Sequence, residues 1–444
     1  MRQSERFGFF KFLVGTLFGI ILVLIPFNFS NGMDTILFHY LKLFINSYQT
    51  IIQSLLVICV VLSALLSLYN LLVKDNFIQK NRLLKKLFAT TPFYVANRFA
   101  GAVISLLCFF KVGPNFIISV DTGTAMLDLA TQLSILVPMM LLFQTFILEF
   151  GAMEFLGELI GFIVKPLFKV SEICAVNIIS AWVGPGNAAI LGTQELFQKG
   201  YFTVKEAAVI GSQFSTSSVG WVVLVSSVLG LMDYFWLIFL GITVIGMVLG
   251  IISVRIPPIK NYPNTYVDGS TVSKVTTNDS GSKLAIAYKN SAHRANSVTL
   301  KNFTSKIDNM TFYVFWLTPI IIFWGTAALI VSMYTPILAW VSLPVELILN
   351  LFGVPDASVT ASAIMSGFAD NYLPVILGKD LVSIESKAII AMMSILQLIF
   401  MSEIATLLKS CQIINKFRDI IIIFLERTFI SLPFVILFVK LFIS

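Results

Sequence analysis

Polar side chains gather inside one apolar stretch, residues 178–220 of the 444-residue chain. Gly184, Pro185 and Gly186 would interrupt a helix there, and Asn187 follows directly. Backbone that leaves its helix at membrane depth frees N–H and C=O groups, which cost several kcal/mol each unless protein or a wet cavity surrounds them. The stretch therefore predicts a re-entrant helical hairpin over about 172–200, with its tip in the protein interior. Secondary transporters bind their solutes at interrupted helices of this kind.

A second interrupted apolar segment covers residues 357–378, with Gly367, Asp370, Asn371 and Pro374 near its middle. A carboxylate at the centre of a bilayer costs about 2.5–3.5 kcal/mol on insertion scales, so Asp370 is a functional candidate. It could pair with a cation, take up a coupling proton or meet a substrate amine. The structural alternative is a hairpin tip that lies near the surface and is solvated.

Amide and hydroxyl groups near the first hairpin could bind a polar solute or Na⁺. Asn187 offers donors and an acceptor, and capping of the hairpin's own backbone is its alternative role. Gln213, Thr216 and Ser217 share one face of a helix by their spacing. Interhelical hydrogen bonding, worth about 0.6–2 kcal/mol per bond, is the structural alternative for that face.

The composition is that of a polytopic helical membrane protein. The chain is 57% hydrophobic and 12% charged, with a mean hydropathy of +0.90. Its net charge of +7 comes from Lys and Arg clustered between apolar runs, which is the positive-inside pattern and argues against nucleic acid. The four cysteines are widely spaced and read as small buried hydrophobes. His39 and His293 fall in loops on opposite sides, so no metal site is predicted.

The basic connectors set the predicted topology. Residues 74–98, 255–306 and 409–418 all fall on one side if the two interrupted segments are hairpins, and the N-terminus joins them in the cytoplasm. Residues 152–170 predict an amphipathic surface helix, with Glu154 and Glu158 opposite an apolar stripe. The polar 255–306 connector is expected to be a poorly ordered linker.

A span is predicted after each hairpin. A capping box of Thr203 and Glu206 opens the first, over about 203–230, and the second covers about 384–408. Both hairpin segments share a glycine three residues before an amide or acid, and both then reach Ile-Leu-Gly. An odd number of crossings separates them, which makes the two halves inverted repeats, a transporter signature.

The run GPGNAAILGTQELFQKGYFTVKEAAVIGSQFSTSSVGW resembles the Gate, or nucleoside-recognition, domain of YjiH-type bacterial inner-membrane proteins. The resemblance is specific from about Phe146 to Gly230 and weaker over the second half. Gate domains are in turn similar to the repeat units of concentrative nucleoside transporters, in which a surface helix, a re-entrant hairpin and two spans occur twice. The first tip here is Gly-Pro-Gly-Asn, not the Gln-Thr-Glu type that reads nucleosides, so the resemblance implies the architecture more than a nucleoside.

The resemblance also implies a site between the hairpin tips and the helices that follow them. The substrate-binding residues that it implies are Asn187, Gln194, Glu195, Gln213, Ser215, Thr216, Asp370, Asn371 and Gln397, with hairpin glycines Gly184, Gly186 and Gly367. The expected fold is all-α, with about eight transmembrane helices and two re-entrant hairpins in inverted repeats. The expected domains are scaffold spans at 1–150, a first Gate repeat at 151–254, a cytoplasmic linker at 255–309 and a second repeat at 310–444.

These observations predict a multi-pass secondary transporter of the bacterial inner membrane, moving a nucleoside-like or amino-acid-like solute. The chain has no G-x-x-x-x-G-K-[ST] motif for nucleotide, so coupling to Na⁺ or H⁺ is expected, with no cofactor or bound metal. No H-E-x-x-H or G-x-S-x-G motif stands out, which argues against an enzyme. The expected partners are the solute and the lipid bilayer, and homo-oligomerisation stays open. The alternative is a Gate-domain membrane scaffold or partner subunit that does not transport.

Overall fold

The computed structural model describes residues 3–23, 25–29, 32–73, 77–183, 186–215, 219–271, 282–401 and 403–443. These residues are almost entirely helical, and strands β1 (Pro26–Phe29) and β2 (Gly32–Thr35) form a small antiparallel pair. Within this described part, seven helical stretches are long and apolar enough to cross a membrane. They are Glu5–Val23, Gln49–Leu72, Pro92–Phe110, Asn115–Leu148, Met232–Ser253, Leu300–Val331 and Phe417–Phe442. The chain is thus an all-α polytopic membrane protein, as the composition predicts.

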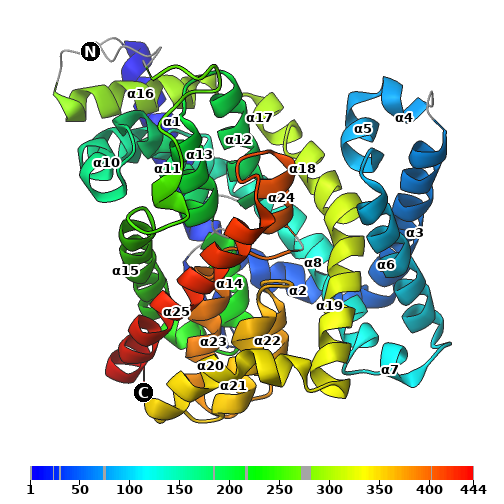
Figure 1. Ribbon diagram of the computed structural model, residues 1–444. Coiled ribbons are helices and arrows are strands. Elements are labelled where there is room, and N and C mark those ends of the chain that lie inside the picture. The colour runs from blue at the N-terminus through cyan, green and yellow to red at the C-terminus, as the bar shows by residue number, and fades with distance from the viewer. Residues whose placement is uncertain are drawn as a thin grey trace. The chain divides into compact units, whose positions relative to one another are not determined.

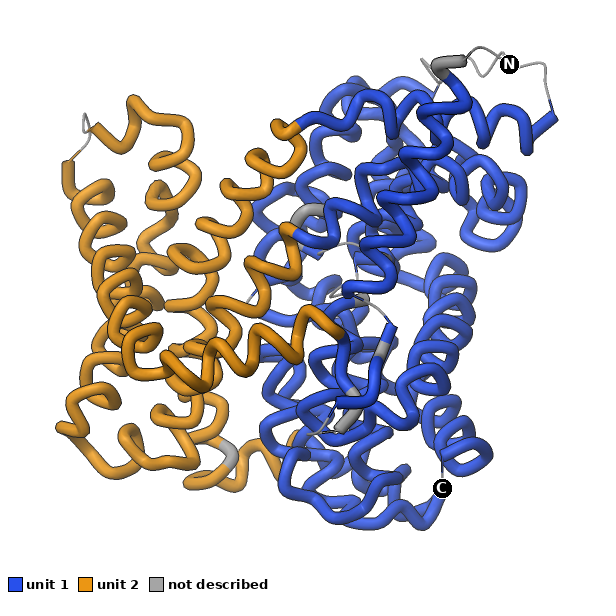
Figure 2. The backbone as a smooth tube through the Cα atoms, turned by 180° about the vertical axis from the view of Figure 1, so that it is seen from behind, with its two compact units in different colours: residues 1–35, 143–299, 342–444 blue, residues 36–142, 300–341 orange. Residues whose placement is uncertain are grey.

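The chain divides into two compact units (Figure 2). Unit 1 contains residues 1–35, 143–299 and 342–444, and unit 2 contains residues 36–142 and 300–341. Both predicted hairpins belong to unit 1, together with the N-terminal helix. The units therefore cut across the four predicted domains, whose boundaries follow the proposed repeats and stay a prediction.

Unit 2 is built around three long helices, α3, α6 and α19, whose facing sides carry small and aliphatic residues such as Val60, Ala64 and Ala102. Its helices are α2 (Ile36–Ser47), α3 (Gln49–Leu72), α4 (Phe77–Lys80), α5 (Arg82–Phe88), α6 (Pro92–Phe110), α7 (Asn115–Ile118), α8 (Gly123–Phe143), α17 (Leu300–Thr304), α18 (Ile307–Phe312), the π-turn η5 (Tyr313–Leu317) and α19 (Thr318–Tyr334). The last residue of α8 lies in unit 1.

Helices α6 and α19 approach so closely at Gly101 that no side chain fits there. A Cβ on Gly101 would overlap the backbone carbonyl oxygen of Pro319. We expect Gly101→Ala to push the two helices apart and lower the free energy of unfolding by about 1–3 kcal/mol, the usual cost of overpacking. Denaturant titration in mixed micelles measures this, with Val103→Ala, an exposed position on the same helix, as the control. An unchanged stability for Gly101→Ala would contradict the close approach.

Unit 1 holds the remaining elements. They are α1 (Gln3–Val23), α9 (Thr145–Leu148), α10 (Ala152–Phe168), η1 (Glu172–Cys174), α11 (Ala175–Val183), α12 (Gly186–Gln198), α13 (Val204–Val209), the π-turn η2 (Ile210–Phe214), α14 (Val219–Val228), η3 (Met232–Tyr234), α15 (Phe235–Ser253), η4 (Ile259–Asn261), α16 (Lys283–Ser297), the part of α20 (Ile337–Leu351) from Ser342 on, α21 (Ala357–Ser366), α22 (Leu373–Gly378), α23 (Ile384–Leu396), α24 (Ile404–Ser410) and α25 (Phe417–Phe442).

Each predicted hairpin is a pair of short helices that pack against one another. Helices α11 and α12 form the first pair, and α21 and α22 form the second. Figure 1 shows the first pair toward one end of unit 1 and the second toward the other end. The second turn follows from its residues: Asp370 Oδ1 accepts a hydrogen bond from the backbone N–H of Tyr372 at 2.8 Å, and Pro374 opens α22.

The helix after each hairpin is interrupted, so the prediction of continuous spans over 203–230 and 384–408 is wrong. The predicted capping box of Thr203 and Glu206 does open α13, but the helix ends in the π-turn η2 and restarts as α14 at Val219. Helix α23 ends at Leu396, and α24 begins at Ile404.

Partners outside the helix stabilise the second interruption. Leu398 takes a left-handed backbone conformation (φ 59°), and the N–H of Met401 donates to the carbonyl of Phe368 at the second hairpin tip, at 2.8 Å. Freed backbone groups of the interrupted helix are thus bonded inside protein, which is the condition for leaving a helix at membrane depth.

The linker expected to be poorly ordered contains a helix. Helix α16 packs along α1 and α10. The ring of Phe9 on α1 stacks on Tyr288 at 4.3 Å between centroids, and a Cβ on Gly8 would overlap the carbonyl oxygen of Ala292. Small and aromatic residues within the polar sequence create this contact. The prediction of a poorly ordered linker rested on average composition, which does not register these few residues. Residues 272–281 lie outside the described part.

Candidate functional site

A single buried arginine on α25 joins the two interrupted helices. Arg427 is 1% exposed. Its Nε donates to the backbone carbonyl of Leu396, the last residue of α23, at 2.8 Å. Its Nη1 donates to Oε1 of Gln213, in η2 just before the first interruption, at 2.5 Å. Gln213 was predicted as a site residue, whereas Arg427 was missed. The charged pair Glu426-Arg427 inside a largely apolar span was the available signal.

Gln397 and the second hairpin tip join the same group of residues. The Nε2 of Gln397 donates to Thr428 Oγ1 at 2.9 Å, one residue beyond Arg427. Its Oε1 is buried and has no hydrogen-bond partner in the described part of the chain. A Cβ on Gly367 would overlap this oxygen, so the glycine lets the tip approach the amide. The predicted residues Gln397 and Gly367 therefore lie together beside α25.

The tip of the second hairpin is buried, not solvated. Asp370 is 3% exposed and Asn371 is 6% exposed. The backbone N–H of Tyr372 donates to the Asp370 carboxylate, and the Tyr372 ring meets the ring of Trp221 edge to face at 5.7 Å between centroids. Trp221 belongs to α14, which follows the first interruption. The second tip thus contacts elements of both predicted repeats.

The first hairpin contributes less to this group. Gly186 begins α12, while Gly184, Pro185 and the side chain of Asn187 lie outside the described residues. Gln194 donates to the backbone carbonyl of Cys411, just after α24, at 3.3 Å. The hairpin is therefore tied to the second interrupted helix, but its tip adds no described contact.

Three further predicted residues fall elsewhere. Glu195 is exposed and forms an ion pair with Lys199 one turn later on α12, at 2.6 Å, so it lies outside the buried group. Ser215 is buried, and its Oγ donates to the carbonyl of Ile210 at 3.3 Å. Thr216 and the neighbouring Ser217 lie outside the described residues.

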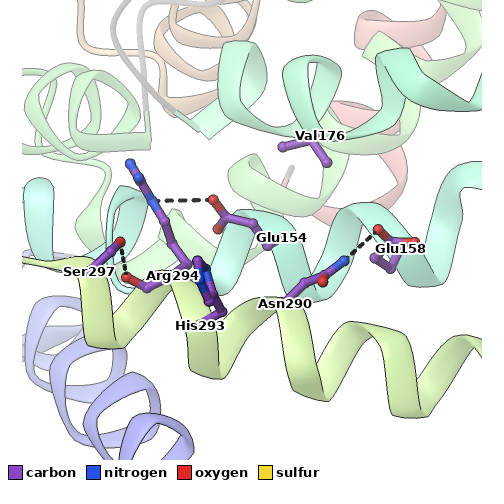
Figure 3. A pocket seen from close by; sticks show the side chains of 7 residues that line it. All are labelled: Glu154, Glu158, Val176, Asn290, His293, Arg294 and Ser297. Atoms are coloured by element: carbon purple, nitrogen blue, oxygen red, sulfur yellow. Dashed lines mark hydrogen bonds and ion pairs between the residues drawn. The ribbon is translucent and has the colours of Figure 1, made fainter. Parts of the chain in front are cut away.

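A second polar cluster lies in a cavity of about 300 Å³ between α10 and α16 (Figure 3). Arg294 of α16 reaches two carboxylates, pairing with Glu149 and, at 3.3 Å, with Glu154 of α10. Asn290 donates to Glu158 at 2.9 Å. The acidic face predicted for the amphipathic helix is therefore turned toward the linker helix, and the cluster fastens α16 to α10.

Burial raises the pKa of the Glu154 carboxyl above its ordinary value of 4.5, and Arg294 only partly opposes this. A carboxyl with a raised pKa in the fold contributes stability at low pH and loses it as the pH rises through that pKa. We expect the contribution of Glu154 to the unfolding temperature to fall as the pH rises above 4.5, and Glu154→Gln to remove that part of the profile. Glu158→Gln, one turn further along α10, is the control. Equal profiles for Glu154→Gln and the unchanged protein would contradict this.

The described helices define an all-α multi-pass membrane protein in which two helical hairpins are each followed by an interrupted helix. No family model matches the chain. It is 32% identical over 445 residues to the uncharacterised protein BpOF4_10220 of Alkalihalophilus pseudofirmus, with 97% of this chain and 94% of that protein covered. The chain belongs to the family of this bacterial protein.

One solved structure, titled "Structure of CNTnw in an inward-facing substrate-bound state", is similar to the chain at a TM-score of 0.41 and 13% identity. The similarity covers 89% of this chain and 99% of that chain. No residue role or substrate comes to this chain from that likeness. The sequence resemblance to Gate domains likewise stays a prediction.

Proposed function

We propose that the protein is a secondary transporter of a small polar solute, coupled to Na⁺ or H⁺, in the bacterial inner membrane with its N-terminus in the cytoplasm. One observation carries the proposal: the buried Arg427 bonds to residues at both interrupted helices. A polar group held where two helices break supports solute binding, because unwound backbone and half-helix ends supply donors and acceptors inside the membrane.

The arrangement also supports movement. The second hairpin tip touches the second interrupted helix through the Met401–Phe368 backbone bond and the first through Trp221. A solute bound among these elements would bias how the hairpin packs, and this differential binding is what shifts a conformational equilibrium. The proposal includes no chemical step and no bound cofactor.

Flux into proteoliposomes tests the proposal. The purified full-length protein is reconstituted, and the uptake of radiolabelled nucleosides and amino acids is measured with Na⁺, H⁺ or no gradient. We expect gradient-dependent uptake of at least one class and a loss of at least about 10-fold for Asp370→Asn, which removes a carboxylate that is 3% exposed. Glu195→Gln, at an exposed position, is the control.

The absence of flux for every class under every gradient would contradict the transporter. Flat uptake together with recovery of a stoichiometric partner from the membrane would identify the protein as a partner subunit instead.

A further inference from the structure

We infer that the transported solute carries an anionic oxygen group, a carboxylate or a phosphate, and that Arg427 binds it. The inference rests on the proposed function and names its substrate class. It separates the two classes that the sequence left open, because amino acids carry a carboxylate and nucleosides are neutral.

Within the described part of the chain, the charge of Arg427 has no counter-ion. Both of its acceptors, the Gln213 amide oxygen and the Leu396 carbonyl, are uncharged. Among the described residues no carboxylate is within ion-pair distance of its guanidinium, and its helix neighbour Glu426 is not one of its partners. Buried guanidinium groups stay charged, and a buried charge is costly unless an opposite charge compensates it. An anionic solute would provide that charge while it is bound.

The guanidinium also keeps donors free for such a group. Arginine has five N–H donors, and the two bonds of Arg427 use Nε and one N–H of Nη1. Nη2 makes no hydrogen bond to the described residues, so the edge between Nη1 and Nη2 keeps donors without an acceptor from that part of the chain. That edge matches the two oxygens of a carboxylate or phosphate. The bonds to Gln213 and Leu396 hold the fork in place, and pre-organisation raises affinity.

Unit 2 offers a matched control in its own buried arginine. Arg98 on α6 is 0% exposed, and its Nη1 donates to Ser67 at 2.6 Å and to the Leu87 carbonyl at 2.8 Å. Its guanidinium lies 5.1 Å from the centroid of the Trp316 ring. Arg98 is remote in sequence from both hairpins. Replacing it reports on the cost of altering a buried arginine without touching the proposed site.

The experiment compares pairs of solutes in which one member carries an anionic oxygen group and the other does not. Uptake and thermal stabilisation of the reconstituted full-length protein are measured with each of a panel of amino acids and its methyl ester, and with uridine and uridine monophosphate. We expect a carboxylate or the phosphate to be taken up and to stabilise the protein, and its neutralised counterpart to do neither. Arg427→Gln should weaken apparent affinity at least about 30-fold, Arg427→Lys should weaken it less, and Arg98→Lys should leave it unchanged.

Each outcome bears on the inference. Uptake of uridine that Arg427→Gln leaves intact would overturn it while the transporter stands. Uptake of no compound would contradict the transporter itself, and the inference with it. Should Arg427→Gln fail to fold, the same solute pairs are compared on the unchanged protein and on Arg427→Lys. Equal uptake of an amino acid and its methyl ester overturns the inference, and uptake of the acid alone supports it. The amino-acid and monophosphate arms distinguish carboxylate from phosphate.

Discussion

Arg427→Met is expected to lower the free energy of unfolding by about 1–3 kcal/mol, and adding Gln213→Leu should recover the part that comes from Gln213 but not the part from the Leu396 carbonyl. In the single variant the buried Gln213 Oε1 loses the donor that now lies at 2.5 Å, and an unsatisfied buried acceptor costs about that much. The removed charge relieves a desolvation penalty, so the loss stays below the 3–5 kcal/mol of a broken buried ion pair. In the double variant both groups are apolar, a replacement that is often neutral or stabilising.

Denaturant titration of the four members of this double-mutant cycle, in mixed micelles, measures the coupling between Arg427 and Gln213. Uptake is measured on the same preparations and should be lost in both Arg427 variants, because restored stability does not restore the guanidinium. Additive changes in stability would show that Arg427 and Gln213 are not coupled. Uptake that returns in the double variant would show that the guanidinium does not bind the solute.

Gly367→Val is expected to abolish uptake and to destabilise the protein by about 2–4 kcal/mol. The new Cβ would overlap Oε1 of Gln397 and lie 3.0 Å from the backbone oxygen of Ile364 and 3.3 Å from Cγ of Pro374. To make room, Gln397 must give up its bond to Thr428, which adds about 1 kcal/mol to an overpacking cost of about 1–3 kcal/mol. The backbone of Gly367 has an ordinary φ of −56°, so the cost is steric and not conformational.

Gly192→Ala provides the matched control on the first hairpin. A Cβ at Gly192 would meet no atom within 4 Å, and alanine favours the helix α12 in which it lies. The exchange should leave uptake unchanged and stability unchanged or slightly raised. Equal losses for Gly192→Ala and Gly367→Val would mean that both glycines serve flexibility, and that the contact with Gln397 is incidental.

The breaks within the hairpins could be predicted because their residues disfavour a helix locally. Gly367 and Pro374 in the second hairpin act through short-range backbone preferences that a sequence displays, while Gly184 and Pro185 of the first lie outside the described residues. These preferences need no knowledge of tertiary contacts. The burial of Asp370 does: the sequence left a solvated tip open, and the fold leaves Asp370 3% exposed.

The interruptions after the hairpins have a different origin. The residues between Leu396 and Ile404 contain neither glycine nor proline, and Leu398 is a poor candidate for a left-handed backbone. Tertiary partners, such as the Phe368 carbonyl for Met401, decide the conformation there, and a local pattern cannot reveal them. The role of Arg427 was missed for a similar reason: its partners lie 31 and 214 residues away in the chain.

The packing of α1 on α16 has a consequence for biosynthesis. Helix α1 ends at Val23, and the helix that stacks on its Phe9 begins at Lys283, so its partner is synthesised some 260 residues later. During translation the first helix must stay in the bilayer with that face covered only by lipid or by an insertion factor. Helix α1 therefore completes its packing only after the ribosome has passed the linker, which makes the docking of α16 a late step in the assembly of unit 1.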